Sequence, residues 1–336
     1  MTATTTRDRP TWPDLPAGVR AGIEARLGAT VTGWTSHDGG YSQGLASTLR
    51  TDRGPVFVKA VPTEHELTAR LYRQEAERSA LLGEGVPAPR LRWLTEIGLA
   101  QGPEWVVLAF DAIEGRVPAQ PWRDDELRAV LDLAVEVGEH EVEVGVLPDF
   151  ASELPVDRAG RLADERPAGL ASFDPWLAEH LDRLSTIERD AASAVAGDRL
   201  VHGDLRGDNA VIVAGGPSRA RGHGPGDHGP GCGGPGRGGA VAVDWAYPGR
   251  GAGFCDLVGM LPAVQVEGGP PPEEALRRRP LPTGTDEDAV TAYLVALAGY
   301  FVHASLQPPP PGIPHVRAFQ RAQGEVCVAW LRRRLA

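Results

Sequence analysis

The chain has 336 residues, which is long enough for two lobes, each with its own apolar core. Its formal net charge of −11 at pH 7 argues against nucleic acid or an anionic membrane surface as a partner. Three cysteines without a C-x-x-C pair, no apolar segment of membrane-spanning length and no signal-peptide pattern in residues 1–16 together favour a soluble, cytoplasmic protein.

The N-terminal third of the sequence alternates short β-type runs with two helical patterns. Apolar residues four apart predict a helix over 15–27. We expect a second helix over 64–82, with Leu67, Leu71 and Leu82 as its buried stripe. Runs rich in β-branched and aromatic residues predict strands over 31–35, 45–49, 55–61, 90–94 and 105–110.

Two features of this region suit a nucleotide. The turn 38–44, Asp-Gly-Gly-Tyr-Ser-Gln-Gly, could lay backbone N–H groups over phosphates, although Gly-Gly is also an ordinary hairpin sequence. Lys59 lies in an otherwise apolar strand, where an ammonium group is unfavourable unless it is paired. The alternative for Lys59 is a charge that protects an edge strand from pairing.

The rest of the chain is predicted to be mainly helical. The segment 150–172 is charged and irregular, and we expect it to be a surface loop, with a substrate-facing insertion as the alternative. The expected helices cover 124–144, 173–195, 286–305 and 314–335.

Two segments lack the pattern of a packed element. Residues 1 to about 15 are polar and contain prolines, so we expect them to be poorly ordered. The tract 214–239 is rich in Gly and Pro and cannot bury enough apolar surface to order itself. Its His223, His228 and Cys232 match no zinc-binding spacing, so we interpret the tract as a flexible insertion.

The most informative stretch is 200–213, Leu-Val-His-Gly-Asp-Leu-Arg-Gly-Asp-Asn-Ala-Val-Ile-Val. It places five polar side chains within eight positions between apolar ends, which core packing does not require. A second apolar run, 240–245, ends in Asp244-Trp245. Phosphoryl transfer needs a base for the attacking hydroxyl and oxygen ligands for Mg²⁺. One loop supplies both if Asp204 and Asn209 converge on one cleft.

The pattern H-G-D-x-x-x-x-N, followed by a strand that ends in D-W, resembles the aminoglycoside phosphotransferase family, small-molecule relatives of the protein kinases. The resemblance covers about residues 30–265. It implies an α+β, protein-kinase-like bilobal fold, with an antiparallel sheet plus helix in the N-terminal lobe and a mainly helical C-terminal lobe. The implied lobes are 1–113, which binds the nucleotide, and 114–336, which carries catalysis and the substrate site, with 214–239 as the insertion.

The resemblance also implies roles for single residues. Asp204 would orient the attacking hydroxyl and accept its proton, and Arg206 would lie near the γ-phosphate. Asn209 and Asp244 would hold Mg²⁺. The implied nucleotide contacts in the N-terminal lobe are Gly40, Ser42, Lys59 and Glu75. The segment between the lobes, which follows the strand 105–110, would bind the adenine through its backbone at Phe110 and Ala112.

Three supporting roles follow from the same resemblance. Glu75 is the expected partner of Lys59, with Glu77 as a close competitor. Asp256 would brace the catalytic loop, residues 202–209. His202 would brace the same loop by hydrogen bonds rather than transfer protons.

The implied activity is transfer of the γ-phosphoryl group of ATP, with Mg²⁺, to a hydroxyl of a small molecule such as an aminoglycoside or another antibiotic. A housekeeping kinase of an amino sugar, sugar or amino alcohol would share every one of these residues. A non-catalytic nucleotide-binding scaffold is a third alternative, against which the completeness of the set argues. A protein-substrate kinase is disfavoured because the stretch between Trp245 and Asp256 leaves little room for an activation loop.

The acceptor is the least determined part of the prediction. The acidic composition suits a cationic acceptor, and Glu179, Asp182 and Glu267 are candidate contacts, although solvated helix faces explain them as well. We expect a monomer or a weak homodimer.

Overall fold

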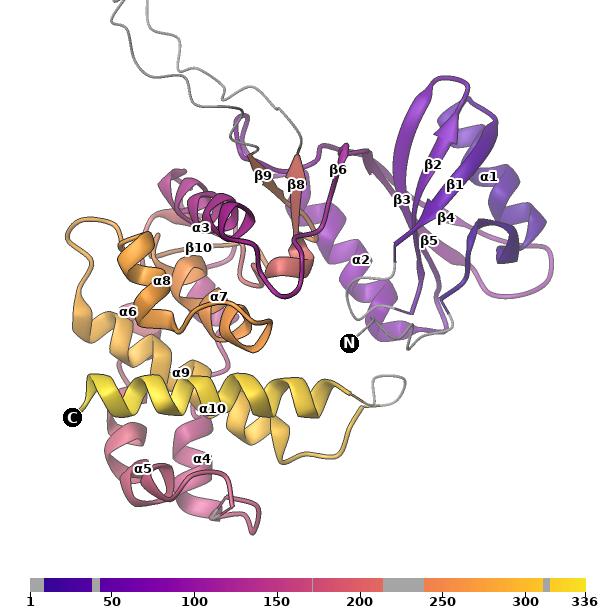
Figure 1. Ribbon diagram of the computed structural model, residues 1–336. Coiled ribbons are helices and arrows are strands. Elements are labelled where there is room, and N and C mark those ends of the chain that lie inside the picture. Colours follow the sequence, from indigo (N-terminus) through magenta and orange to yellow (C-terminus); the bar gives the residue numbers. More distant parts are fainter. Residues whose placement is uncertain (1–8, 38–42, 171, 214–238, 311–314) are drawn as a thin grey trace, which may run out of the picture.

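The computed structural model describes residues 9–37, 43–170, 172–213, 239–310 and 315–336, which form an α+β fold of two lobes (Figure 1). The N-terminal lobe holds a five-stranded antiparallel sheet in the order β1-β2-β3-β5-β4. Its strands are β1 (Val31–Ser36), β2 (Leu45–Thr51), β3 (Gly54–Pro62), β4 (Leu91–Ile97) and β5 (Trp105–Asp111). All five expected strands are confirmed, each within a few residues of its predicted ends.

Two helices, α1 (Ala17–Leu27) and α2 (Glu66–Ser79), cover opposite faces of this sheet. Val56 and Val58 of β3 pack in the cluster that contains α1, whereas Phe57 and Val61 pack with α2. Successive side chains of a strand point to opposite faces, so Lys59 shares the face of Phe57 and Val61. The α2 face is the one that looks toward the other lobe in Figure 1.

The buried stripe expected for the second helix is wrong. Leu67 is 59% exposed, and Leu71 and Leu82 are only partly buried. Contact with the sheet and with Lys59 sets the rotation of α2. Glu75 is therefore buried, although hydrophobicity alone would predict that it is exposed. The buried residues of α2 are Ala69, Tyr72, Glu75, Ala76 and Ser79.

The C-terminal lobe is mainly helical. Its helices are α3 (Asp124–Glu139), α4 (Arg158–Glu165), α5 (Pro175–Glu188), α6 (Ala191–Ala194), α7 (Cys255–Val266), α8 (Pro272–Arg278), α9 (Glu287–Ser305) and α10 (Val316–Arg334). Two small antiparallel sheets accompany these helices, and the three-stranded one lies on the side toward the first lobe (Figure 1). They are β6 (Gly115–Arg116), β8 (Ala210–Val213) and β9 (Ala240–Ala242), and β7 (Arg199–Val201) with β10 (Gly249–Gly251).

Two predictions for the start of this lobe are wrong. The helix expected to reach residue 144 ends at Glu139, because the carbonyl of His140 accepts a hydrogen bond from the N–H of Leu200 and draws the chain alongside β7. The segment 150–172, expected to be irregular, contains α4. Ala159 and Leu162 are buried there, so this short helix contributes to the core.

The helix expected over 173–195 is divided into α5 and α6, which are separated at Arg189 and Asp190. The two C-terminal helices, α9 and α10, are confirmed. Helix α7 was not predicted, and its sequence explains why. It is buried almost all round and contains Pro262, so it has neither an amphipathic period nor an uninterrupted helical composition.

The N-terminal segment is ordered from Arg9 onward, in contrast to the expectation for residues up to about 15. Trp12 and Leu15 are 7% and 2% exposed and join the cluster under α1. The side chain of Asp14 accepts hydrogen bonds from the backbone N–H and hydroxyl of Thr11, at 2.8 and 2.5 Å, which fixes the intervening turn. Residues 1–8 lie outside the described part of the chain.

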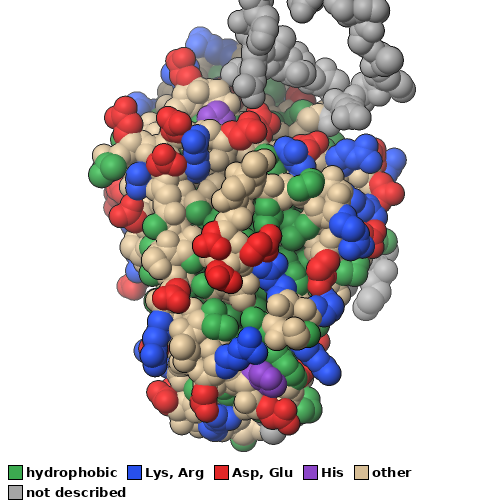
Figure 2. Space-filling model, turned by 90° about the vertical axis from the view of Figure 1, so that its left-hand side faces the viewer, with side chains coloured by type: hydrophobic (Ala, Val, Ile, Leu, Met, Phe, Trp, Pro, Cys, Tyr) green, Lys and Arg blue, Asp and Glu red, His purple; other side chains and the backbone are tan. Residues whose placement is uncertain are grey.

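Two bulk properties accompany this architecture. Within the described ranges, no helix is both long and apolar enough to cross a membrane. On the face of the molecule shown in Figure 2, acidic and basic side chains are interspersed rather than gathered into patches of one sign.

The tract expected to be an insertion, 214–239, lies outside the described residues except for Gly239, but its two ends are well placed. Strands β8 and β9 pair in antiparallel register, and the N–H of Val213 donates to the carbonyl of Gly239 at 3.0 Å. A two-residue hairpin turn therefore has the geometry to join these two residues.

We predict that replacing residues 214–238 with Asn-Gly preserves the fold. Loop closure costs about 0.6 kcal/mol per doubling of length, so the shorter loop lowers this cost and the free energy of unfolding should not fall. Urea unfolding measures this free energy, with a Gly/Ser loop of the native length as the control. Loss of cooperative unfolding in the Asn-Gly variant alone would contradict the prediction.

Candidate active site

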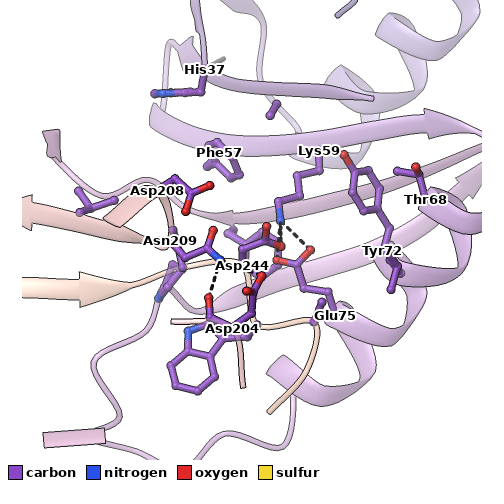
Figure 3. A pocket seen from close by; sticks show the side chains of 18 of the residues that line it. His37, Phe57, Lys59, Thr68, Tyr72, Glu75, Asp204, Asp208, Asn209 and Asp244 are labelled. Atoms are coloured by element: carbon purple, nitrogen blue, oxygen red, sulfur yellow. Dashed lines mark hydrogen bonds and ion pairs between the residues drawn. The ribbon is translucent and has the colours of Figure 1, made fainter. Parts of the chain in front are cut away.

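The residues singled out in the sequence meet in one cavity of about 820 Å³ between the lobes (Figure 3). Ala112 lies between two lining residues, Asp111 and Ile113, without lining the cavity itself. Gly40 and Ser42 lie outside the described residues, so their expected contacts stay predictions. The sequence-predicted residues that line the cavity are Lys59, Glu75, Phe110, Asp204, Arg206, Asn209 and Asp244.

Lys59 connects three distant segments in this cavity. Its Nζ donates to both carboxylate oxygens of Glu75 at 2.7 Å and to Oδ1 of Asp244 at 2.8 Å (Figure 3). Of the two glutamates considered for this contact, Glu75 is 2% exposed and makes it, whereas Glu77 is exposed on the outside of α2. Strand β3 lies between β2 and β5, so it is not an edge strand. The alternative of an edge-protecting charge for Lys59 is therefore wrong.

The charges of this group support one another. Burial lowers the pKa of Lys59, but the carboxylates of Asp244 and Glu75 outweigh it and raise the pKa above its ordinary value. Burial raises the pKa of Asp244, yet the Lys59 ammonium holds it below the ordinary range. Burial also raises the pKa of Glu75, against the opposing effect of Lys59. A charged lysine and an ionised Asp244 therefore coexist at neutral pH.

The backbone of Asp244 takes a conformation that non-glycine residues rarely adopt, with φ of 66°. The neighbouring Trp245 is 1% exposed, and its Nε1 donates to the carbonyl of Ala242 at 2.9 Å. This anchor holds the turn after β9, so that the carboxylate of Asp244 faces the cavity. Such strain persists only where the surroundings enforce it, and it is frequent at functional sites.

His202 begins the loop between β7 and β8 and is fully buried. Its Nδ1 accepts from the N–H of Asp204 at 3.3 Å, so Nε2 carries the proton that is donated to the carbonyl of Val243 at 3.0 Å. Burial lowers the pKa of His202 to about 4, which leaves the ring neutral. His202 thus ties the loop of Asp204 to the segment that carries Asp244.

Asp256, at the start of α7, holds the same loop from behind. Its carboxylate oxygens accept from the N–H of His202 at 2.6 Å and of Gly203 at 3.0 Å. Gly203 has φ of 82°, and a Cβ there would lie 2.5 Å from the carbonyl oxygen of Tyr247. The position therefore requires glycine, and the loop is held in one conformation.

Asp204 and Asn209 close the loop on the cavity side. The Nδ2 of Asn209 donates to the backbone carbonyl of Asp204 at 2.8 Å and to its carboxylate at 3.3 Å. This arrangement leaves the amide oxygen of Asn209 as its metal-binding atom. The side chain of Asp204 is 42% exposed toward the cavity, and its partial burial raises its pKa to about 7, against the opposing charge of Arg206.

Comparison with known proteins identifies the family of the chain. The model of the phosphotransferase enzyme family matches residues 34–222, which is more than half of the chain. The chain belongs to the phosphotransferase enzyme family. No curated protein matches it in sequence.

Solved structures with the same fold are distant in sequence from this phosphotransferase. A spectinomycin phosphotransferase, solved with ADP and spectinomycin, is 11% identical over 93% of this chain and 96% of that one, with a TM-score of 0.52. A thermostable aminoglycoside phosphotransferase variant, solved with ADP and hygromycin B, is 14% identical over 94% and 98%, with a TM-score of 0.52. The ethanolamine kinase of Plasmodium vivax is 11% identical over 88% and 80%, with a TM-score of 0.50.

The donor set of the phosphotransferase fits a hard cation held jointly with phosphates. In the described ranges, no cluster of three or more His, Cys, Asp or Glu side chains is arranged to hold a metal alone. Mg²⁺ in phosphate sites commonly takes only one or two protein carboxylates. This site offers one carboxylate, that of Asp244, and one further oxygen donor, the amide oxygen of Asn209.

Arg206 lies beside the proposed base. Its Nε is 3.5 Å from a carboxylate oxygen of Asp204 and 3.2 Å from one of Asp208, and its guanidinium carbon is 6.0 Å from the centre of the Phe319 ring. The side chain is 15% exposed and lines the cavity. Arg206 therefore places a positive charge on the cavity wall beside two carboxylates.

The three acidic residues considered as contacts of the acceptor differ in their distance from the cavity. Glu179 and Asp182 are exposed on α5, outside the cavity lining, and Asp182 pairs with Arg166 at 3.3 Å. Glu267, at the end of α7, accepts from Nε1 of Trp122 at 3.2 Å and lies against Gly207 of the catalytic loop. Burial and the nearby Asp208 raise the pKa of Glu267 to about 7. Only Glu267 adjoins the site.

Sequence reasoning missed several residues of the cavity. Arg9 lines it and donates from Nη1 to the carbonyl of His37 at 3.1 Å. His37 is hydrogen-bonded to the hydroxyl of Thr48 at 2.9 Å, and its ring centre lies 5.6 Å from that of Phe57. The apolar pair Trp12 and Leu15 was the available signal that this segment packs against the sheet.

We predict that His202 makes stability depend on pH. Its pKa is lower in the folded state, near 4, than the ordinary 6.5, so the unfolded chain binds more protons and the contribution of His202 is lost as the pH falls from 6.5 toward 4. Between pH 8 and pH 5 this loss is about 2 kcal/mol. Urea unfolding measures the free energy of unfolding of the wild type and of His202→Asn at pH 8 and at pH 5. The difference between the two proteins should change by this amount between the two pH values. A difference that stays constant with pH would show that His202 can be charged in place.

Proposed function

We propose that this phosphotransferase transfers the γ-phosphoryl group of ATP to a hydroxyl group of a small molecule. The observation that carries the proposal is the convergence of two carboxylates, those of Asp204 and Asp244, with the paired ammonium of Lys59 in a single cavity between the lobes. Each of the three comes from a different part of the chain. Phosphoryl transfer is mainly a matter of positioning and of charge stabilisation, which such a constellation provides.

Asp204 is the proposed base. Its carboxylate is oriented by Asn209, and the loop behind it is held by His202 and Asp256. A pKa of about 7 places a proton acceptor near neutral pH, where proton availability and basicity are balanced for general-base catalysis. Asp204 would orient the acceptor hydroxyl toward the phosphorus and take its proton as the bond forms.

The nucleotide would lie between the sheet and the catalytic loop. Lys59, held by Glu75, would align the phosphates, and the hinge backbone near Phe110 and Ala112 would bind the base. Mg²⁺ held by Asn209 and Asp244 would neutralise charge on the phosphate oxygens. Arg206, beside Asp204, would stabilise the negative charge of the transferring group.

For the acceptor, we propose a hydroxyl compound that carries positive charge, with aminoglycoside-type antibiotics as the first class to examine. Support comes from Glu267, whose carboxylate lies beside the loop and whose pKa is raised to about 7 by burial and by the nearby carboxylate of Asp208. A protonated amine near the two carboxylates would relieve their repulsion. The ligands spectinomycin and hygromycin B of the two structural relatives belong to the same chemical class.

The test separates the two aspartates. Asp204→Asn keeps the shape but removes the base, so kcat should fall by about 10²- to 10⁴-fold while Mg·ATP affinity is retained. Asp244→Asn removes a charged ligand, so both kcat and Mg²⁺-dependent ATP affinity should fall. ATP consumption is measured against a panel of aminoglycosides, other antibiotics, amino sugars and amino alcohols, and calorimetry with and without Mg²⁺ gives the affinities.

Asp182→Asn is the matched control, since Asp182 is an exposed aspartate on α5 outside the cavity. It should behave as the wild type in both measurements. Full turnover by Asp204→Asn would exclude the base assignment. A wild type that binds ATP but transfers phosphate neither to any compound of the panel nor to water would favour the non-catalytic scaffold.

A further inference from the structure

Besides Glu75, two other residues of helix α2, Gln74 and Arg78, lie against the C-terminal lobe. Nε2 of Gln74 donates to the carbonyl of Ala246 at 2.6 Å, and Nη1 of Arg78 approaches the same oxygen at 3.4 Å. The N–H of Ala246 in turn donates to the carbonyl of Asp244 at 2.9 Å. The turn that carries Asp244 is therefore held by the same helix that carries Glu75.

Arg78 also forms an ion pair across the lobes. Its Nη2 lies 2.5 Å from Oε1 of Glu153, and the two side chains are only 13% and 26% exposed. Glu153 lies three residues after Phe150, and its N–H donates to the carbonyl of Phe150 at 3.0 Å. Phe150 is 4% exposed and packs against Gly249 and Gly251 of β10. The segment that carries Glu153 is thus packed on the core of the C-terminal lobe, and the carboxylate of Glu153 is largely buried.

The spacing along α2 joins these contacts into one unit. Residues four apart lie on the same side of a helix, so Gln74 and Arg78 face the turn after β9 together. Glu75 is displaced from them by one residue and faces Lys59. A rotation or shift of α2 would therefore change the Lys59–Glu75 contact and the position of Asp244 at once.

We propose that Arg78 and Glu153 form a latch that positions α2 across the lobes and so assembles Lys59, Glu75 and Asp244 before the nucleotide binds. The inference rests on the proposed function, because the latch acts through residues assigned to nucleotide and metal binding. Arg78 and Glu153 are positioning residues, since neither lines the cavity.

The chain contains a matched control on the same helix. Arg73 of α2 pairs with Glu96 of β4 at 2.7 Å, and these side chains are 38% and 36% exposed. Both members of that pair belong to the N-terminal lobe, so it makes no connection across the cavity. Arg73→Ala removes an arginine and an ion pair from α2 without affecting the contact between the lobes.

The experiment compares Arg78→Ala, Glu153→Ala and Arg73→Ala in the full chain, by kcat and KM for ATP hydrolysis without acceptor and by calorimetry with Mg·ADP. Because a misplacement of about 1 Å can cost about 10²-fold, we expect kcat of both latch variants to fall on the order of 10- to 100-fold, with weakened Mg·ADP binding. Arg73→Ala should stay within about twofold of the wild type, since exposed pairs contribute little. Thermal midpoints confirm that each variant is folded at the assay temperature.

A charge reversal distinguishes positioning from a general loss of stability. Arg78→Glu and Glu153→Arg should each be impaired, and the double variant should recover a large part of kcat. If either single variant fails to fold, Arg78→Lys takes its place and should retain more kcat than Arg78→Ala. Equal kcat and Mg·ADP affinity in Arg78→Ala and Arg73→Ala would overturn the latch while leaving the proposed function intact. A wild type that neither binds Mg·ADP nor hydrolyses ATP would overturn the proposed function and the latch with it.

Discussion

A buried ammonium group requires negative partners, and in this protein that requirement organises the site. Lys59 is 8% exposed on the central strand β3, and it is compensated by Glu75 from α2 and Asp244 from the turn after β9. An unpaired ammonium in that position would be strongly unfavourable. The three segments therefore have to meet, and their meeting point is the cavity between the lobes.

The remaining features of the site keep this meeting point rigid. His202 is neutral and fully buried, so both ring nitrogens are committed to hydrogen bonds that join the two catalytic segments. Asp256 fixes the loop from the other side, and the unusual φ of Asp244 aims its carboxylate at Lys59. Because these side chains hold one another in place, little reorganisation would be needed as charge develops in the proposed transfer.

The sequence was most informative where chemistry dictates spacing. Asp204, Asn209 and Asp244 were singled out by their spacing as the proposed base and metal ligands, and the five strands were predicted from β-branched runs and turns. Lys59 was found as the one charge in an apolar strand. The family resemblance rested on these spacings and implied the α+β fold, and the family match supports that resemblance.

Other features depend on contacts between distant segments and could not be predicted from local patterns. Gln74, Arg78 and Glu153 look like ordinary solvated helix and loop residues until the lobes are placed together. Helix α7 has no polar face to reveal it, and the rotation of α2 is set by Lys59 rather than by its leucines. Arg9 enters the cavity only because Trp12 anchors the segment beside it.

We infer that Lys59 and Glu75 form one coupled unit that stabilises the site and, in the proposed reaction, aligns the phosphates. The most direct test is a double-mutant cycle of Lys59→Met and Glu75→Gln, measured by urea unfolding and by Mg·ATP calorimetry. Removing one partner of a buried pair should destabilise the fold by about 3–5 kcal/mol, and the double variant should recover much of that loss without regaining ATP affinity. Additive effects on stability, or wild-type ATP affinity in Lys59→Met, would contradict the claim.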